Sequence, residues 1–361
     1  MYKDQQNTFA KPVRWLLYAS LLWFLSACSS LSYYKQAIEG QVELLQKRRP
    51  LIEVIEDTNV DAVVRERLQL VQQARSYAVN ELMLPDNDSY KDYADLGRPY
   101  VMWSVFVTPA YSLKPIQWCY PLLGCIGYKS YFSKGQAQLF ADSMRAKDND
   151  VYIAGVPAYS TLGWFDDPVI NTMMHWQDYD LVGTLFHELA HQKFYVKNET
   201  VFNESLAKTI EQVGLQRWMQ LQKQTNQYEQ YLLEAEREKA FIQLVLGTRH
   251  ELEDLYQTSI SRQEMFLGKM KIFRSMRSAY LQLRQQWGGH DSYDHWVLSG
   301  VNNAKVQSIA TYYDYVPAFE NILIEQGGDL NKFYSIIDGL IEKTIEDRRT
   351  YLEGYLTEKE N

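Results

Sequence analysis

The chain has 361 residues, enough for one large domain or two modest ones. Its composition, 46% hydrophobic and 23% charged, is ordinary for a globular protein. The formal net charge of −8 argues against nucleic acid as a partner, because a phosphate-binding surface needs a basic excess and the chain has no long basic run.

The first residues have the pattern of a bacterial lipoprotein signal. Three basic residues precede the apolar stretch "WLLYASLLWFLSA", which is too short to span a bilayer comfortably. The stretch ends in "LSAC", which resembles a lipobox whose cysteine, Cys28, becomes the lipidated first residue of the mature chain. We therefore expect a signal peptide at 1–27 and a lipidated linker at 28–32. The serine after Cys28 is typical of outer-membrane lipoproteins, so we expect an outer-membrane anchor facing the periplasm. An uncleaved short anchor is the alternative.

The N-terminal part of the mature chain is predicted to be helical, and the part after it is predicted to contain strands. Residues 33–80 carry apolar residues at three- and four-residue steps, which predicts a pair of helices broken near Pro50. Between residues 98 and 165, "YVMWSVFV", "GYKSYF" and "DVYIAGVPAYSTL" predict strands, and "KGQAQLFADSMRAK" predicts a helix. This part is expected to form a small mixed sheet with a helix across it.

The segment "WCYPLLGC" contains the two remaining cysteines, Cys119 and Cys125. Pro121 and Gly124 favour a tight loop between them. In an oxidising periplasm a local disulfide would steady this loop. Two unbonded, packed cysteines are the alternative.

Residues 180–197 are expected to form a helix capped by Asp180, and this helix carries "HELAH". Residues four apart lie on one helical face, so His187 and His191 can present their imidazoles to one ion. Zinc prefers such ligands, and a catalytic zinc keeps one position open for water. Glu188 can take a proton from that water, which is the zincin pattern. Apolar flanks predict that the helix is buried, where unpartnered polar groups would be costly.

A third ligand is expected from the following helix, which runs to about residue 222. Glu204 in "NESLA" fits the zincin group that takes a glutamate from this helix, and the intervening chain is long enough to turn back. Glu199 and Glu211 are the nearest alternatives. Asn203 is expected to cap the helix or to orient the site. One Zn²⁺ per chain follows from this set of ligands.

The rest of the chain is predicted to be helical. Residues 226–287 have almost no proline or glycine, and a long helical hairpin is predicted at 226–290, broken near "LGTRH". Two further helices are expected at 299–325 and 329–356. The hairpin could serve as a lid or docking arm of an enzyme, or as the partner-binding part of a scaffold.

The expected fold is α+β and mainly helical, with a small mixed sheet beside the "HELAH" helix. A single domain is expected at 33–356. Its parts are a helical portion at 33–97, the sheet and zinc site at 98–225, the hairpin at 226–290 and C-terminal helices at 291–356.

Five segments together carry a family resemblance: "WCYPLLGCIGYKSYF", "DVYIAGVPAYSTLGWFDDPV", "FHELAHQKFYVKNETVFNES", "NNAKV" and "YVPAFE". They resemble the putative zinc aminopeptidase family of bacterial lipoproteins, a domain long described as of unknown function. The resemblance covers nearly the whole mature chain. It implies zinc on His187, His191 and Glu204, Glu188 as the base, a zincin-like fold similar to the gluzincin peptidases, and peptides as substrates.

Hydrolysis also needs a donor to the developing oxyanion. Gluzincins often use a tyrosine or histidine for this purpose. Tyr312 in "SIATYYDYVPAF" is the expected donor, and Tyr313 and His295 are alternatives. The asparagines at 302–303 could hold substrate ends or start a helix, and the helix start is favoured.

Substrate binding is expected beside the zinc. An edge strand there could pair with an extended substrate backbone through main-chain groups. Val156 to Thr161 could form this strand, and Tyr159 could shape a subsite.

An aminopeptidase also needs acidic groups to hold the free amine of its substrate. Asp166, Asp167 and Asp178 lie near the site in sequence, but their positions do not assign them to this role, and the first two also fit a turn. Exopeptidase and endopeptidase action therefore both stay open, and the resemblance favours an aminopeptidase. A non-catalytic envelope scaffold with structural zinc is a further alternative, although structural zinc would not need Glu188.

Overall fold

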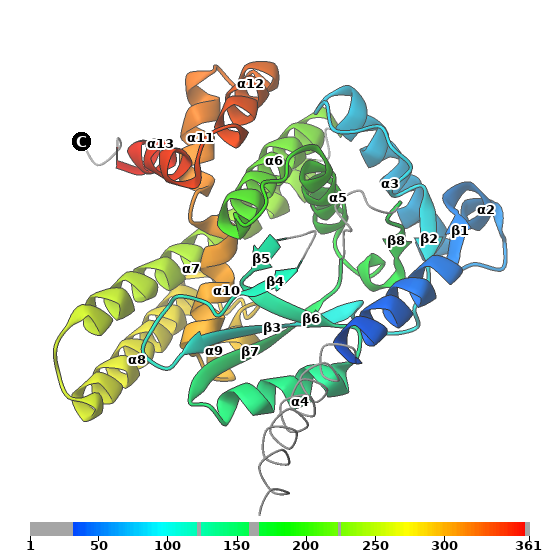
Figure 1. Cartoon of the computed structure of the whole chain (residues 1–361). Coiled ribbons are helices and arrows are strands. Elements are labelled where there is room, and N and C mark those ends of the chain that lie inside the picture. The colour runs from blue at the N-terminus through cyan, green and yellow to red at the C-terminus, as the bar shows by residue number, and fades with distance from the viewer. Residues whose placement is uncertain (1–31, 121–123, 159–165, 223–224, 358–361) are drawn as a thin grey trace, which may run out of the picture.

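The computed structural model describes residues 32–120, 124–158, 166–222 and 225–357. Within these residues the chain is mainly helical with small sheets, so the predicted α+β class is confirmed (Figure 1). No helix in the described part is long and apolar enough to span a membrane. The predicted signal peptide and Cys28 lie outside the described residues.

Residues 32–46 are helical, and the elements after them alternate between helices and short strands before the described chain becomes helical to its end. In chain order they are β1 (Arg48–Pro50), α2 (Leu51–Glu56), α3 (Ala62–Asn80), β2 (Asp92–Ala94), β3 (Met102–Pro109), β4 (Trp118–Tyr120), β5 (Gly124–Ile126), β6 (Tyr128–Tyr131), α4 (Lys134–Arg145), β7 (Asn149–Val156), β8 (Val169–Ile170), η1 (Asn171–Met173), α5 (Asp178–Lys193), α6 (Thr200–Gln222), α7 (Thr225–Gln257), α8 (Arg262–Gln286), α9 (Asp294–Leu298), α10 (Asn303–Tyr313), α11 (Val316–Glu325), α12 (Leu330–Ile341) and α13 (Ile345–Thr357).

The sheet built from residues 102–156 is antiparallel, with strand order β6–β3–β7, so the expected mixed sheet is wrong for this part of the chain. Mixed pairing occurs instead where β2 joins β1 antiparallel and β8 parallel. Side chains alternate across β3, as the pleat requires. Val105 and Val107 are buried in one cluster with Ala137 and Ala141 of α4. The other face of the sheet is available to α10, which also packs on β3 and β7.

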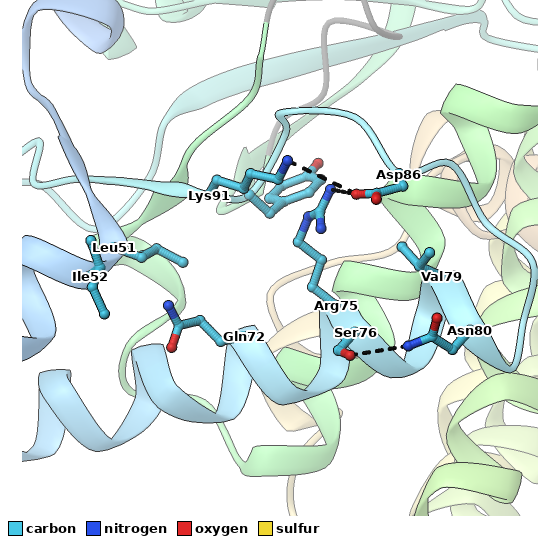
Figure 2. A pocket seen from close by; sticks show the side chains of 10 residues that line it. Leu51, Ile52, Gln72, Arg75, Ser76, Val79, Asn80, Asp86 and Lys91 are labelled. Carbon is cyan, nitrogen blue, oxygen red and sulfur yellow. Dashed lines mark hydrogen bonds and ion pairs between the residues drawn. The ribbon is translucent and has the colours of Figure 1, made fainter.

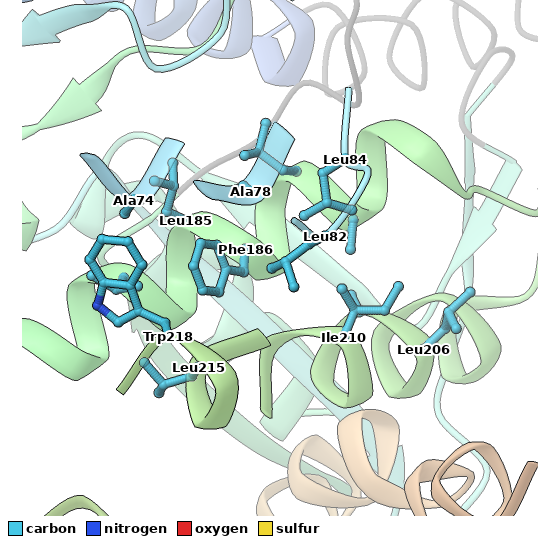
Figure 3. Close-up of a cluster of buried hydrophobic side chains, with 14 of the residues drawn as sticks. Ala74, Ala78, Leu82, Leu84, Leu185, Phe186, Leu206, Ile210, Leu215 and Trp218 are labelled. Atoms are coloured by element: carbon cyan, nitrogen blue, oxygen red, sulfur yellow. The ribbon is translucent and has the colours of Figure 1, made fainter. Parts of the chain in front are cut away.

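The main hydrophobic core surrounds α5, which packs against α3 and α6. Figure 3 shows Phe186 of α5 among side chains from these helices. Gly214 lets α6 approach closely, because a Cβ there would lie 2.6 Å from Leu82 Cδ1 and 3.0 Å from Phe186 Cδ2. The helix that carries the candidate ligands is thus held in the largest core cluster of the described residues.

The ends of α5 differ from the prediction. Gln177 is the N-cap, so the expected cap at Asp180 is wrong; Asp180 lies in the first turn, where its charge favours the helix dipole. The helix ends at Lys193 instead of residue 197. Phe194 is extended and buried, and its ring centroid lies 5.1 Å from that of Tyr334 on α12. Tertiary packing of Phe194 accompanies this early end.

The long hairpin consists of α7 and α8, which pack against each other. The expected break near residues 246–250 is wrong, because α7 continues to Gln257. Val245 and Leu252 on either side of that segment are buried in the cluster that α7 shares with α8. The turn comes before Arg262, where Ser261 and Glu264 form a reciprocal capping box.

The two expected C-terminal helices are each divided. The first is interrupted between α10 and α11, near Pro317, which takes an early helical position in α11. The second is interrupted between α12 and α13, where Arg348 donates to the carbonyls of Leu340, Ile341 and Lys343. These bonds satisfy carbonyl groups that the end of α12 leaves without helical partners.

Candidate metal centre

Three buried side chains converge between α5 and α6. The Nε2 atoms of His187 and His191 lie 3.1 Å apart, and Glu204 Oε2 lies 3.4 Å from the first and 3.3 Å from the second. A tetrahedral zinc ion with ligands at about 2.0–2.1 Å would separate them by roughly 3.3 Å. The triangle therefore has the size expected of three ligands on one ion.

The local structure explains this convergence. His187 and His191 are one helical turn apart on α5, so their imidazoles point to the same side. Glu204 comes from α6, which packs along α5. Burial favours the neutral form of each group, but the opposite charges outweigh it: the pKa of Glu204 falls to about 2 and that of His187 rises to about 10. The buried centre thus stabilises the negative carboxylate of Glu204 beside the positive charge of the histidines.

Glu211 supports the first histidine from behind. His187 Nδ1 lies 3.1 Å from Glu211 Oε2, to which an Nδ1–H would donate. In the neutral ring that a metal would bind, this tautomer would leave Nε2 unprotonated and aimed at the centre. Lys208 Nζ donates to the other oxygen of Glu211 at 2.8 Å. Glu211, considered as an alternative third ligand, therefore lies on the far side of His187.

Glu199, the other alternative, is also engaged elsewhere. Its carboxylate is buried and lies 3.5 Å from Arg348 and 3.3 Å from Arg349. These contacts join the start of α6 to α13. Of the three glutamates considered as third ligands, Glu204 is the one that meets both histidines.

Glu188 lies beside the first histidine and is half-buried. Burial raises its pKa, although the charges of His187 and His191 lower it. The charge of Glu188 also helps to raise the pKa of Tyr128 and Tyr312, so its carboxylate lies in the neighbourhood of these phenols.

Tyr312 lies at the centre. The charge of Glu204 and burial hold its pKa well above the usual range, and its ring centroid is 6.3 Å from that of His187. Tyr313 instead donates its hydroxyl to Glu238 at 2.6 Å, and His295 is exposed on α9. Among these three predicted donors, only Tyr312 is brought to the histidines.

Sequence reasoning missed Tyr128. This residue lies on β6 directly opposite Phe106 of β3, on the sheet face shared with Tyr152 of β7. Burial raises its pKa, and the charges of Glu204 and Glu188 raise it further. The chain has 27 tyrosines, and no spacing within "GYKSYF" distinguishes this one.

Asn203 does not cap α6 as expected, because the helix begins three residues earlier at Thr200. Its side chain instead closes the connection between the two helices. Asn203 Oδ1 accepts from Val196 N and its Nδ2 donates to Val196 O, both at 2.8 Å. Asn203 thus fixes the turn that brings Glu204 back toward α5.

The asparagines at 302–303 start α10, which confirms the favoured interpretation. Asn302 Oδ1 accepts from Lys305 N at 2.9 Å. Asn303 is fully buried; its Oδ1 accepts from the Tyr256 hydroxyl at 2.8 Å, and its amide donates to main-chain carbonyls between 109 and 112. These bonds anchor the helix that carries Tyr312.

The disulfide hairpin lies against the same connection. Cys119 and Cys125 are bonded across β4 and β5, and Cys125 N donates to Asn198 Oδ1 at 2.7 Å. Gly124 has a φ of 82°, and a Cβ there would lie 2.3 Å from Asn198 Oδ1. The hairpin therefore docks on the segment between α5 and α6 in a way that requires glycine.

The expected substrate-binding residues are only partly described. Val156 ends the edge strand β7, packs against a hydrophobic cluster, and accepts from Val101 N at 2.9 Å through its carbonyl. Tyr159 and Thr161 lie outside the described residues.

Of the three aspartates considered for amine binding, Asp178 is 3.1 Å from Arg67. Asp167 is buried, and its main chain bonds to Ser89 and Tyr90. The carbonyl of Asp166 accepts from Arg48. Asp178 is therefore paired with an arginine, whereas the bonds of Asp166 and Asp167 named here involve their main chains and assign no role to their carboxylates.

A separate pocket of about 430 Å³ lies beside α3 (Figure 2). Arg75 occupies one wall, where it pairs with Asp86 at 3.0 Å and donates to the carbonyls of Ser89 and Asn87. The pocket shares no residue with the metal centre, and its arginine is already satisfied by the protein.

A comparison with protein families found a match over most of the chain. The family model described as "Putative aminopeptidase" matches residues 32–352, which include the candidate metal centre. No match was found among curated proteins or among solved structures.

Proposed function

The chain belongs to the putative aminopeptidase family, and we propose that it is a zinc-dependent peptidase that removes residues from the N-terminus of peptides in the bacterial cell envelope. One observation carries this proposal: two histidine nitrogens and a glutamate oxygen form a buried triangle of ligand size, with Glu188 beside it. Two imidazoles and one carboxylate are a ligand set typical of catalytic zinc.

The residues present fit zinc. His187 and His191 supply nitrogen, Glu204 supplies oxygen, and Glu211 fixes the ring of the first histidine. When bound, zinc would polarise the scissile carbonyl and make water a better nucleophile at neutral pH.

Glu188 is proposed as the general base. It would accept a proton from the attacking water and pass it to the leaving amine. The rise in its pKa caused by burial supports this role, because a carboxylate that retains a proton more readily is a better base.

Tyr312 and Tyr128 are proposed as oxyanion donors. Like an ordinary tyrosine, both phenols are protonated at neutral pH, and their raised pKa extends this to higher pH. Each can therefore donate a hydrogen bond to charge that develops on the carbonyl oxygen. Because they come from α10 and β6, a carbonyl held between them would lie where the helical and sheet parts meet. The segment 156–161, which begins at the end of the edge strand β7, stays the proposed binding site for the substrate backbone.

The test measures metal content and peptide cleavage together. Wild type should bind one zinc per chain and cleave peptides with a free N-terminus. Glu188→Gln should keep zinc and lose about 10²–10⁴-fold in kcat, since general acid–base catalysis contributes about that much. Glu204→Ala should lose zinc. Glu251→Gln, a change at an exposed residue of α7, is the matched control and should behave as wild type.

The substrates separate the alternatives. Cleavage of N-acetylated peptides as fast as free ones would contradict an aminopeptidase and support an endopeptidase. Tight zinc binding without cleavage of any peptide would favour a non-catalytic scaffold, especially if Glu188→Gln keeps full function in cells.

We also propose that Cys28 is lipidated and anchors the chain in the outer membrane, facing the periplasm. The lipobox-like "LSAC" supports this proposal. Mass spectrometry of the mature protein should find residue 28 at the N-terminus with attached acyl groups. An unmodified Cys28, or a chain that keeps residues 1–27, would contradict it.

A further inference from the structure

A second pocket, of about 860 Å³, lies at the start of the described chain. It lies where the helix at 32–46 meets the sheet and α4. Aromatic residues dominate its lining, which includes Tyr33, Trp118, Tyr120, Tyr131 and Phe140. We call it the N-terminal aromatic pocket. It shares no residue with the metal centre.

The pocket also carries positive charge without a matching carboxylate. Lys129 Nζ lies 4.2 Å from the ring centroid of Tyr33 and 5.0 Å from that of Phe140. Burial lowers the pKa of Lys129, and no acidic side chain offsets this effect. Lys147 also lines the pocket, and neither lysine pairs with a carboxylate in the described part of the chain. An anion from outside the protein would supply the missing charge.

The helix at 32–46, which contributes Tyr34 to the pocket lining, exposes apolar side chains in a regular arrangement. Tyr34, Ile38 and Val42 follow one another at four-residue steps on one face of the helix at 32–46 and are 44%, 63% and 42% exposed. Leu139 of α4, which also lines the pocket, is 73% exposed. Single exposed apolar residues are ordinary, but a stripe beside an aromatic, cationic pocket has the chemistry of a membrane interface.

We propose that this surface rests on the bilayer and that the N-terminal aromatic pocket takes the anionic headgroup of a phospholipid. The proposal rests on the proposed lipidation of Cys28. Three residues separate Cys28 from Ser32, which lines the pocket, so a fully extended chain keeps the two within about 14 Å. An acyl anchor at Cys28 therefore holds this pocket, and no distant surface, next to the headgroups.

The test measures how close two sites come to the bilayer. Full-length lipidated protein is reconstituted in phosphatidylethanolamine vesicles with and without phosphatidylglycerol, and some lipids carry a headgroup quencher. A fluorophore is attached through Ser143→Cys, which lines the pocket, or through Ser335→Cys on α12. Figure 1 places α4 and α12 at opposite sides of the molecule. The introduced cysteine is the only free thiol, because Cys119 and Cys125 are bonded and Cys28 is acylated.

Quenching at position 143 should exceed that at position 335 several-fold. Leu139→Glu should reduce it, whereas Ile324→Glu, a similarly exposed residue on α11, should not. Lys129→Gln should remove the extra quenching that phosphatidylglycerol causes. Equal quenching at both positions, or no effect of Leu139→Glu, would overturn the docking surface. If phosphatidylglycerol increases the quenching equally in wild type and in Lys129→Gln, the headgroup site is overturned.

Failure of the proposed lipid anchor and failure of the proposed peptidase function can each be distinguished from failure of the docking surface. Mass spectrometry of the same preparation shows whether Cys28 is acylated, and an unacylated chain overturns the anchor and the docking surface together. Peptide cleavage by the same vesicles, compared with Glu188→Gln, reports the proposed catalytic function separately. Quenching without cleavage would leave the docking surface standing and count against the peptidase.

Discussion

At the scale of single residues, the candidate centre depends on groups that do not touch the ion. Glu211 holds the far nitrogen of His187, and Lys208 holds Glu211. Such partners fix the tautomer and orientation of the ligand and raise its basicity.

Glu211→Gln should weaken zinc binding by roughly 10–100-fold, because the amide still accepts from His187 but no longer carries the charge that makes the ring more basic. Competition with a chromophoric chelator measures the Kd, and Glu251→Gln is the control. An unchanged Kd would show that His187 is oriented by packing alone.

Lys305 permits a prediction about pH. It is buried, and its Nζ donates to Ser299 Oγ at 2.9 Å and Gly300 O at 3.2 Å. No carboxylate among the described residues pairs with it. Burial lowers its pKa from about 10.5 to about 8. Between these values the unfolded chain binds more protons than the folded one, so this residue makes the folded state more stable as pH rises.

Lys305→Met should therefore change the pH dependence of stability. The free energy of unfolding of the variant, relative to wild type, should fall as pH rises from about 8 to above 10. Urea unfolding across that range measures the slope, which is independent of the hydrogen bonds that methionine loses at every pH. A constant difference between the two proteins would contradict the lowered pKa.

The sequence predicted the residues whose spacing is local. His187, His191 and Glu204 lie within eighteen residues, so helical periodicity and the length of the connecting chain were enough to predict that they come together. Tyr128 comes from a strand about sixty residues earlier, and its position depends on how the sheet packs against α10. Pairings of this kind are set by tertiary contacts, which no single-sequence pattern contains.

At the scale of elements, the connections were harder to predict than the helices. The break in the long hairpin lies just before the capping box of Ser261 and Glu264, which starts α8. This capping box is a stronger signal for a break than Gly247, which lies inside the continuous helix α7. The end of α5 at Lys193 accompanies the burial of Phe194 against α12, a contact across a long stretch of sequence. Local propensity therefore predicted most helices but not where they end.

The contact between the disulfide hairpin and the α5–α6 connection can be tested at one glycine. Gly124→Ala should destabilise the fold by about 2–4 kcal/mol, because alanine at positive φ costs about 1–2 kcal/mol and its Cβ would also overlap Asn198. Gly97→Ala is the matched control. Gly97 has a φ of 64° but open space around its Cβ, so it should lose only the backbone part. If urea unfolding shows the same decrease in the free energy of unfolding for Gly124→Ala and Gly97→Ala, the close contact between the hairpin and Asn198 is contradicted.

At the scale of the whole molecule, one hydrophobic cluster joins distant parts of the chain. It includes residues of α3, α5 and α6 together with Phe319 of α11, Phe333 of α12 and Leu352 of α13. Arg348 and Glu199 add a buried ion pair between α13 and the start of α6. The C-terminal helices therefore support α5 and α6, the two helices that carry the ligands. The apolar periodicity of the C-terminal helices did not indicate which part of the chain they would pack against.

This arrangement predicts that metal binding and global unfolding are coupled. His187 and Glu204 come from different helices, and the folded core with the turn fixed by Asn203 holds them within 3.4 Å. Zinc should therefore bind the folded chain and not the unfolded one, which adds about 4 kcal/mol to the free energy of unfolding when free zinc is about 1,000 times Kd.

Removing zinc with a chelator should lower the Tm of wild type, and added zinc should restore it. Glu204→Ala should melt at one temperature with or without the chelator, because a missing ligand abolishes the coupling. Glu188→Gln should respond as wild type does, since Glu188 is not a ligand, and this separates metal binding from catalysis. A wild-type Tm that ignores both chelator and zinc would contradict a metal held between α5 and α6.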